Sequence, residues 1–150
     1  MFKILFICHG NICRSPMAEF VMKDMVKKRG IADKFFIASC ATSTEEIGNP
    51  VHHGTRNKLA EFGISVKGKV AVQLTKTDYD KYDYLIAMDT NNIRNIFRII
   101  GTDPENKVCK LLEFADSSAD IADPWWTGNF DDTYDDILRG CNALLEKIGF

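Results

Sequence analysis

Apolar residues follow two different spacings along this chain, and their alternation predicts strands separated by helices. Residues 2–7 are almost all strand formers, with Lys3 the one polar residue, which is typical of a buried strand in a parallel sheet. Similar runs predict further strands at 35–41, 82–89 and 107–114, and a short extended segment at 70–74.

Helical spacing, with apolar residues three or four positions apart, starts at Pro16 and stops at Gly30. Ser15 and Pro16 predict the beginning of this helix, with Ser15 as the N-cap and Pro16 at the first helical position. Further helices are predicted at 50–62, within 75–82, at 91–100 and in the last segment, where residues 134–148 form one apolar stripe.

These elements together predict a three-layer α/β/α domain with a central, mostly parallel sheet. The 150 residues, 45% of them hydrophobic, suit one compact core, so residues 1–150 are expected to form a single domain. Ligands of such sheets bind beyond the carboxyl ends of the strands, and Cys8 stands at the end of the first strand.

Charge and cysteine usage narrow the classes of function. A net charge of −2 and a pI near 5.9 give no reason to expect nucleic acid or an anionic membrane as a partner. No apolar run has the length of a membrane span, and because the first residues lead directly into the first strand, we expect no signal sequence. The cysteines, which lack C-x-x-C spacing and so favour a reducing cytoplasm, are Cys8, Cys13, Cys40, Cys109 and Cys141. We therefore expect a cytoplasmic protein without a metal or other cofactor, in which the last three cysteines fill the core.

The loop at residues 8–15, between the first strand and the first helix, has the chemistry of a phosphate site. Free amides and the helix dipole at a helix N-terminus favour an anion. Gly10 lets the backbone come close, Asn11 tolerates a left-handed conformation, and the planar fork of Arg14 can hold two phosphate oxygens. Since a thiolate is stabilised at a helix N-terminus and beside a cation, Cys8 is a candidate nucleophile toward phosphorus. A buried, inert cysteine is the alternative.

Several segments resemble one known family. "CHGNICRSP" at residues 8–16 resembles the signature C-x-G-N-x-C-R-S-P of low-molecular-weight protein tyrosine phosphatases. "ADPWW" at 122–126 is similar to the Asp-Pro followed by aromatic residues of that family, and "SCATSTEEIGNP" at 39–50 and "DYLIAMD" at 83–89 also look alike. The similar segments span most of the chain in the right order.

The resemblance implies a chemical role for each residue of a phosphate-binding loop after the first strand. Cys8 would be the nucleophile, Arg14 the phosphate clamp, and Asp123 the general acid that later activates water. Ser15 would donate its hydroxyl to the Cys8 thiolate, and Asn11, held by Ser39, would keep the loop in shape. The phosphate would be held by amides of His9, Gly10, Asn11, Ile12, Cys13, Arg14 and Ser15.

The resemblance also implies a substrate slot for phosphotyrosine in a protein or peptide, on a monomer or weak dimer. Trp125 and Trp126 would form one wall of the slot, together with Ile12. Many relatives have tyrosines in place of these tryptophans. Glu45 stands where relatives often place an aromatic residue on the opposite wall, so substrate preference is open at this position.

Two further expectations concern residues near the slot. Cys13 is expected to be a redox partner, because a neighbouring thiol can capture the sulfenic acid of an oxidised Cys8. His52 and His53 are expected on the solvated surface.

Three other functions compete with phosphotyrosine hydrolysis. Phosphoarginine phosphatases resemble this chain but have Thr at the position of Ile12. Arsenate reductases need two more cysteines close together, whereas Cys109 and Cys141 are far apart in the sequence. A non-catalytic phosphate-binding module would need neither Cys8 nor Asp123. A tyrosine phosphatase is therefore the preferred interpretation.

Overall fold

The computed structural model describes all 150 residues of the chain. Its strands are β1 (Phe2–Cys8), β2 (Phe35–Ala41), β3 (Tyr84–Ala87) and β4 (Val108–Lys110). Its α-helices are α1 (Arg14–Lys28), α2 (His53–Ala60), α3 (Asp78–Lys81), α4 (Thr90–Ile100), α5 (Pro124–Thr127) and α6 (Phe130–Ile148). The 3₁₀ helices are η1 (Ala32–Lys34) and η2 (Leu111–Ala115).

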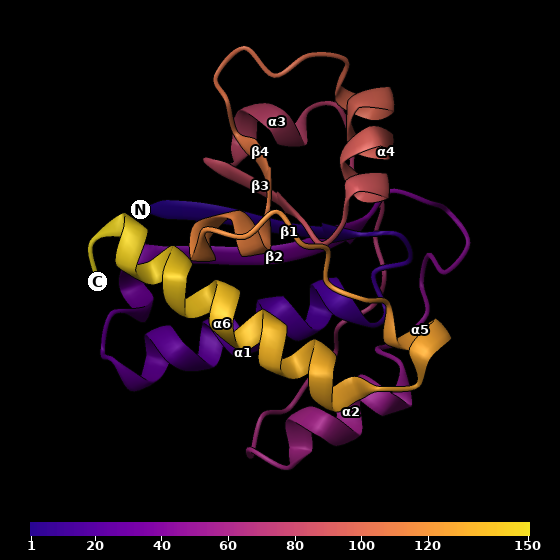
Figure 1. The fold of residues 1–150 in the computed structure, drawn as a ribbon, viewed down its shortest axis with the longest axis vertical. Coiled ribbons are helices and arrows are strands. Elements are labelled where there is room, and N and C mark those ends of the chain that lie inside the picture. Colours follow the sequence, from indigo (N-terminus) through magenta and orange to yellow (C-terminus); the bar gives the residue numbers. More distant parts are fainter.

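The strands form one parallel sheet in the order β2–β1–β3–β4. β1 pairs with β2 from Phe2↔Phe35 to Cys8↔Ala41, so the first strand is held along its whole length. Helices α1 and α6 cover one face of this sheet, with α2 beyond them, and α3 and α4 cover the other face (Figure 1). The predicted three-layer α/β/α architecture with a parallel sheet is confirmed.

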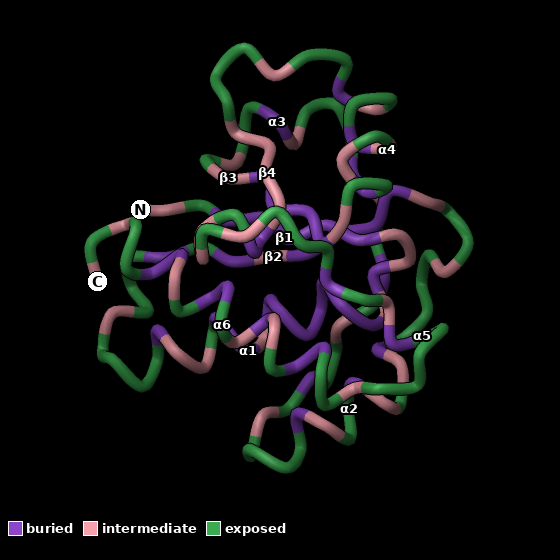
Figure 2. The backbone as a smooth tube through the Cα atoms, viewed as in Figure 1, coloured by how far each residue is buried: buried purple, intermediate pink, exposed green.

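The side chains of β1 alternate between two hydrophobic cores, because neighbouring residues of a strand point to opposite faces. Ile4, Phe6 and Cys8 belong to the core shared with α1 and α6, and Leu5 and Ile7 belong to the core shared with α3 and α4. Figure 2 shows buried residues along the strands and on the helix faces turned toward them. The alternation directs the Cys8 side chain to the face of the sheet on which α1 lies.

One edge of the sheet collects the ends of the strands and the loops that follow them. The segment that leads into α5 is joined to this edge by a backbone hydrogen bond of 2.9 Å from Ile121 N to the carbonyl of Met88, just after β3. In Figure 1, α5 lies on the side where the chain leaves β1, and both termini lie on the opposite side. The rings of Phe2 and Phe150 are 6.0 Å apart there. The fold therefore brings the loop after β1 close to the segment around residue 123.

The beginning of α1 differs from the prediction. The helix starts at Arg14, and Cys13 rather than Ser15 is its N-cap. The hydroxyl of Ser15 lies 3.0 Å from Cys8 Sγ and accepts a hydrogen bond from Asn11. Because these contacts use the hydroxyl, the prediction that Ser15 caps the helix is wrong.

Other predicted boundaries change where packing overrides the local pattern. The predicted strand at 107–114 ends at Lys110, because Leu111 and Leu112 are buried in η2 against α6. Gly140 allows this close packing, since a Cβ there would lie 2.4 Å from Leu111 Cγ. The segment 70–74 forms only isolated bridges, Ala41↔Gln73 and Pro50↔Val70, and the helix predicted at 50–62 is reduced to α2.

The apolar stripe of the last helix is confirmed. Its buried residues are Thr133, Tyr134, Ile137, Gly140, Cys141, Leu144 and Leu145. Cys40 and Cys141 are buried as expected, whereas Cys109 is only partly buried. None of the helices combines the length and the hydrophobicity that crossing a bilayer requires.

Candidate active site

The loop after β1 wraps around the sulfur of Cys8. Cys8 ends β1 and is 3% exposed. Asn11 has a φ of 57°, in the left-handed region that Asn adopts more readily than most residues, and its amide donates to Cys8 Sγ at 3.3 Å. The left-handed conformation thus turns a backbone donor toward the sulfur.

Side-chain hydrogen bonds connect Cys8 to β2. The hydroxyl of Ser15 lies 3.0 Å from Cys8 Sγ. The side-chain amide of Asn11 donates to Ser15 Oγ at 2.8 Å and to Ser39 Oγ at 2.9 Å. Because Ser15 Oγ accepts from Asn11, its own proton is available to Cys8 Sγ or to the Cys40 carbonyl, which lies 3.4 Å away. The contact between Asn11 and Ser39 that the resemblance implies is present.

Glu19, in α1, extends this network and is absent from the sequence predictions. Its carboxylate is 4% exposed and accepts hydrogen bonds of 2.6 Å from both Ser39 Oγ and Lys23 Nζ, with Lys69 Nζ 3.7 Å away. Burial lowers the pKa of Lys69 against the opposing pull of the Glu19 carboxylate. Since Ser39 donates to Glu19, its oxygen remains an acceptor for Asn11. The signal in the sequence is an acidic residue within an apolar helix face.

The guanidinium of Arg14 is 3% exposed and is held by groups far away in the sequence. Its Nη1 lies 2.6 Å from Asp89 Oδ2 and donates to the Ile121 carbonyl at 2.9 Å, while Nη2 lies 3.6 Å from Asp123 Oδ2. Burial opposes the charge, but the thiolate of Cys8 and the carboxylate of Asp89 outweigh burial and raise the pKa of Arg14. With Nη1 engaged, Nη2 and Nε are the atoms able to meet a phosphate.

Asp89 is a second residue that sequence reasoning misses. It follows β3 and is the N-cap of α4, with Oδ1 accepting from the amide of Asn92 at 2.7 Å while Oδ2 pairs with Arg14. The feature of the sequence that could have identified Asp89 is an acidic residue directly after a predicted parallel strand, because the ends of such strands meet at the same sheet edge as Cys8.

Asp123 precedes α5 and uses its two carboxylate oxygens differently. Oδ1 accepts from the amide of Trp125 at 3.1 Å, which makes Asp123 the N-cap of α5, and Oδ2 faces Arg14. The capping contact fixes the direction of the carboxylate. One aspartate thus both begins a helix turn and lines the pocket that contains Cys8.

A pocket of about 370 Å³ lies over the loop. It is lined by Cys8, His9, Gly10, Ile12, Cys13, Arg14, Glu45, Glu46, Asp123, Trp125 and Trp126. The fold therefore brings together the predicted nucleophile, clamp, acid and wall residues, and it adds Glu46, which the sequence predictions omit. Asn11, Ser15 and Ser39 do not line the pocket and are joined to one another by hydrogen bonds.

The lining of this pocket includes exposed aromatic residues and a histidine–glutamate pair. Trp125 and Trp126 are 53% and 82% exposed. His9 Nε2 lies 2.9 Å from Glu45 Oε2.

Cys13 lines the same pocket as Cys8 and is buried. Burial, with the nearby Asp123 and Cys8, raises the pKa of Cys13 to about 12, so its sulfur stays a neutral thiol. Its carbonyl accepts a hydrogen bond of 3.2 Å from Thr55 Oγ1, in α2. The predicted redox pair thus shares one pocket.

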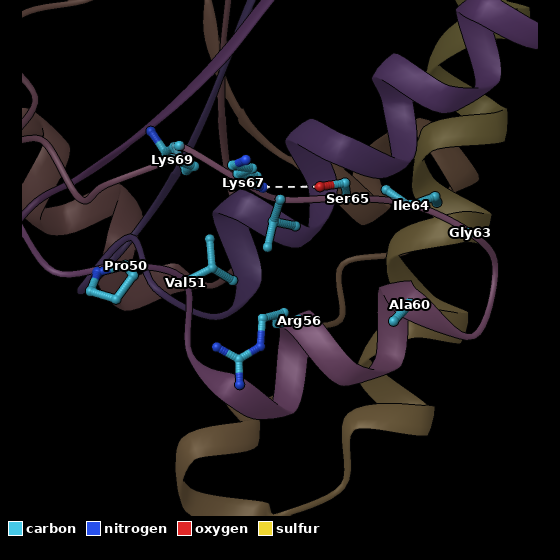
Figure 3. Close-up of a pocket in the computed structure, with 11 residues that line it drawn as sticks. Pro50, Val51, Arg56, Ala60, Gly63, Ile64, Ser65, Lys67 and Lys69 are labelled. Carbon is cyan, nitrogen blue, oxygen red and sulfur yellow. Dashed lines mark hydrogen bonds between the residues drawn. The ribbon is translucent and has the colours of Figure 1, made fainter.

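A second pocket, of about 530 Å³, lies between α2 and the segment that follows it (Figure 3). Arg56, Lys67 and Lys69 are its charged residues, and Val51 and Val66 are its buried apolar ones. Its lining includes no thiol and no carboxylate. The groups that could perform chemistry gather at the smaller pocket.

Comparison with known proteins agrees with this geometry. The family model described as low molecular weight phosphotyrosine protein phosphatase matches residues 3–149. The chain is 41% identical over 150 residues to the low molecular weight protein-tyrosine-phosphatase YfkJ of Bacillus subtilis, covering 99% of this chain and 96% of YfkJ. It is 38% identical over 149 residues to PtpA of Staphylococcus aureus, covering 99% and 94% of the two chains.

Solved structures show the same similarity in three dimensions. The crystal structure of YfkJ from Bacillus subtilis superposes with a TM-score of 0.93, covering 99% of this chain and 94% of that one. A drosophila arginine phosphatase, 25% identical, superposes with a TM-score of 0.90 over 99% of each chain. The fold is therefore shared with phosphatases whose names differ in the amino acid that carries the phosphate.

Proposed function

This chain belongs to the low molecular weight phosphotyrosine protein phosphatase family, and from that premise we propose that it hydrolyses phosphotyrosine through a phosphocysteine formed on Cys8. The main support is the environment of the Cys8 sulfur. It lies at the edge of a pocket with Arg14 and Asp123, and it is contacted by the Asn11 amide and the Ser15 hydroxyl.

In the first step, the Cys8 thiolate attacks phosphorus and the bond from phosphorus to the phenolic oxygen breaks. The electron pair of that bond leaves with the oxygen, and protonated Asp123 supplies the proton. Tyrosine has a pKa of about 10, so its phenolate is a poor leaving group near neutral pH and an acid is needed. The loop amides and Arg14 stabilise the charge on the phosphate oxygens.

In the second step, water attacks the phosphorus of phosphocysteine. Asp123, now a carboxylate, takes a proton from the water, and the sulfur–phosphorus bond breaks with its electron pair returning to Cys8. Inorganic phosphate is released. Ser15, whose hydroxyl lies 3.0 Å from the sulfur, donates to the thiolate and stabilises it as it leaves.

Arg14 holds the phosphate with the atoms that Asp89 leaves free. The contact of Nη1 with Asp89 and the Ile121 carbonyl sets the orientation of the guanidinium plane. Nη2 and Nε then present two parallel donors, the arrangement that suits a phosphate. Asp89 is thus a positioning residue for the clamp.

The substrate is an aryl phosphate on a protein or peptide. The slot beside Ile12, Trp125 and Trp126 favours a flat ring, with aromatic contacts worth about 1 kcal/mol beyond burial. Its competitor is phosphoarginine, since the chain also superposes on an arginine phosphatase. The aliphatic side chain of Ile12 supports the aryl ester, because a hydroxyl at this position would suit a guanidinium.

The unpaired cysteines support a reducing cytoplasm as the place where the enzyme works, and we propose a monomer or weak dimer that uses no metal. The test is turnover of phosphotyrosine, phosphoserine and phosphoarginine peptides in the presence of a chelator. Phosphotyrosine should exceed phosphoserine by about 10²-fold in kcat/KM, or about 2.7 kcal/mol. Cys8→Ser should bind phosphate without turnover. Activity in Cys8→Ser would exclude the thiolate mechanism, and faster phosphoarginine hydrolysis would overturn the substrate class alone.

A further inference from the structure

His52 is partly buried and lies among aromatic side chains, so the prediction of a solvated surface position holds for it only in part, whereas His53 is exposed as expected. The imidazole of His52 is stacked on Phe130, with centroids 5.6 Å apart and planes at 8°. It also makes a T-shaped contact with Trp125, with centroids 5.4 Å apart and planes at 72°. His52 therefore joins three elements, since it precedes α2 while Trp125 belongs to α5 and Phe130 begins α6.

The contact between Phe130 and α2 leaves no room for a side chain at position 54. A Cβ on Gly54 would lie 2.2 Å from Phe130 Cζ and within 2.6 Å of two more ring atoms. The ring of Phe130 is thus packed directly on the backbone of the first turn of α2. This close approach fixes the face of Phe130 on which His52 stacks.

The backbone of His52 is itself attached to the phosphate loop. Its N–H donates to the carbonyl of Ile12 at 2.9 Å, and Thr55 Oγ1 donates to the carbonyl of Cys13 at 3.2 Å. These two hydrogen bonds attach the start of α2 to the loop that surrounds Cys8. A side chain that packs against His52 is therefore held in position relative to that loop.

The segment that contains Asp123 has few other contacts that could place it. Helix α5 has four residues, and Trp125 and Trp126 are largely exposed. Its hydrogen bonds to the rest of the chain lie on the N-terminal side of Asp123: Ile121 N to the Met88 carbonyl, Arg14 Nη1 to the Ile121 carbonyl, and Thr133 Oγ1 to the Ala122 carbonyl. Asp123 itself faces Arg14, and Pro124 is buried. Further along the chain, the Trp125 indole and the His52 ring meet in a T-shaped contact.

We propose that His52 is a positioning residue for the general acid: its imidazole, stacked on Phe130, holds Trp125 and thereby sets Asp123 against the phosphate loop. The inference rests on the proposed role of Asp123. A displaced acid slows proton transfer to the leaving oxygen, because that step requires hydrogen-bond reach. It leaves phosphate binding by the loop amides and Arg14 unchanged.

The role of the His52 ring in packing and the role of its Nδ1 atom in capping α2 can be tested separately by substitution. His52 Nδ1 accepts from the amide of Gly54 at 3.1 Å, so Nδ1 is unprotonated and the ring is neutral. His52→Asn retains an acceptor for this cap but removes the ring, whereas His52→Phe retains a ring but removes the acceptor. Asn57→Ala, at an exposed position of α2, is the matched control.

The readout is the dependence of kcat on the leaving group. Each variant is assayed with a phosphotyrosine peptide and with an aryl phosphate whose phenol has a pKa of about 7, which needs little help from an acid. His52→Asn should lose about tenfold more kcat on phosphotyrosine than on the activated ester, with inhibition by inorganic phosphate unchanged. His52→Phe and Asn57→Ala should keep the wild-type ratio. Gly54→Ala, which displaces Phe130, should change the ratio in the same direction as His52→Asn.

Three outcomes would overturn the inference. Equal losses on the two substrates in His52→Asn would assign the ring a purely structural role. A changed ratio in His52→Phe with an unchanged ratio in His52→Asn would assign the effect to capping. Asp123→Asn, measured in parallel, tests the premise separately: if it shows no leaving-group dependence, the assignment of Asp123 as the acid fails and this inference fails with it. A dependence in Asp123→Asn without one in His52→Asn leaves the proposed function intact and overturns only the inference.

Discussion

At the scale of single residues, the pocket holds two cysteines in different surroundings. The Cys8 sulfur is contacted by the Asn11 amide and the Ser15 hydroxyl. Cys13 has its pKa raised to about 12 by burial and by Asp123 and Cys8, so it remains a thiol. A nucleophile with a neutral thiol lining the same pocket is suited to reversible oxidation.

This pairing predicts how the enzyme responds to peroxide. Oxidation of Cys8 gives a sulfenic acid, which condenses with the Cys13 thiol to a disulfide and releases water. Wild type should recover activity after a thiol reductant, while Cys13→Ser should lose activity progressively and irreversibly. Recovered activity is measured after timed exposure to peroxide. Cys109→Ser, which removes a thiol outside the pocket, is the control, and equal recovery in Cys13→Ser would refute a protective role.

Residue 12 is expected to set the choice between phosphotyrosine and phosphoarginine. Ile12 lines the slot, and a threonine of similar shape would add a hydroxyl able to accept from a guanidinium. Ile12→Thr should therefore shift the kcat/KM ratio toward phosphoarginine by about tenfold, a difference of about 1.4 kcal/mol. Ile12→Val has the same branching without the hydroxyl and should leave the ratio near that of wild type. If Val and Thr behave alike, side-chain size and not the hydroxyl determines the preference.

At the scale of elements, the contact between α6 and η2 explains why the predicted fourth strand is short. Leu111 is fully buried against Gly140, where a helix would otherwise favour alanine. The burial of this leucine requires the chain to leave the extended conformation after Lys110. Tertiary packing thus overrides an apolar run that is equally compatible with a strand.

This contact reverses the usual effect of a glycine substitution in a helix. Gly140→Ala places a Cβ 2.4 Å from Leu111 Cγ, so it should lower the free energy of unfolding by about 1–3 kcal/mol. Without the contact, alanine would raise it by up to about 1 kcal/mol. Denaturant titration decides the sign, and Asn142→Ala, exposed on the same helix, should change stability by less than about 0.5 kcal/mol. A higher free energy of unfolding in Gly140→Ala would contradict this prediction and show that Leu111 in η2 can move aside at little cost.

At the scale of the whole molecule, the two hydrophobic cores share β1, whose residues alternate between them. Because both cores include side chains of β1, displacing this strand from one core also disrupts the packing of the other core. The phosphate loop follows β1 directly, so occupation of the loop is coupled to the stability of the entire sheet. We therefore expect the chain to unfold as one cooperative unit.

Inorganic phosphate, which the loop should bind, provides the test of this coupling. At 100 times its Kd, phosphate should raise the free energy of unfolding by about 2.7 kcal/mol, because it binds the folded state alone. Thermal unfolding followed by near- and far-ultraviolet circular dichroism should give one coincident transition that moves upward with phosphate. Arg14→Lys, which keeps the charge but loses the planar fork, should show a smaller shift. Two separate transitions, or one that phosphate leaves in place, would contradict the coupling.

The sequence by itself determined the elements whose causes are local. The strand at 2–7, the helix after Arg14 and the stripe at 134–148 follow from spacing alone. Cys8 and Arg14 lie within seven consecutive residues, so one short loop brings nucleophile and clamp together. Asn11 supplies the left-handed conformation that the loop adopts, and this tolerance is intrinsic to the residue type.

Tertiary structure alone decided the partners of these residues. Asp89, which orients Arg14, is 75 positions away, and no local pattern specifies that pair. Glu19 and Ser39 meet because α1 packs on β2, and the Ser15 hydroxyl turns from the predicted cap to Cys8 because that network surrounds it. His52 is partly covered because Phe130 and Trp125, which are far away in the sequence, pack against it. The periodicity of apolar residues predicts which residues are buried. Which residues contact one another depends on how the helices and strands pack, and this packing is determined by the whole fold.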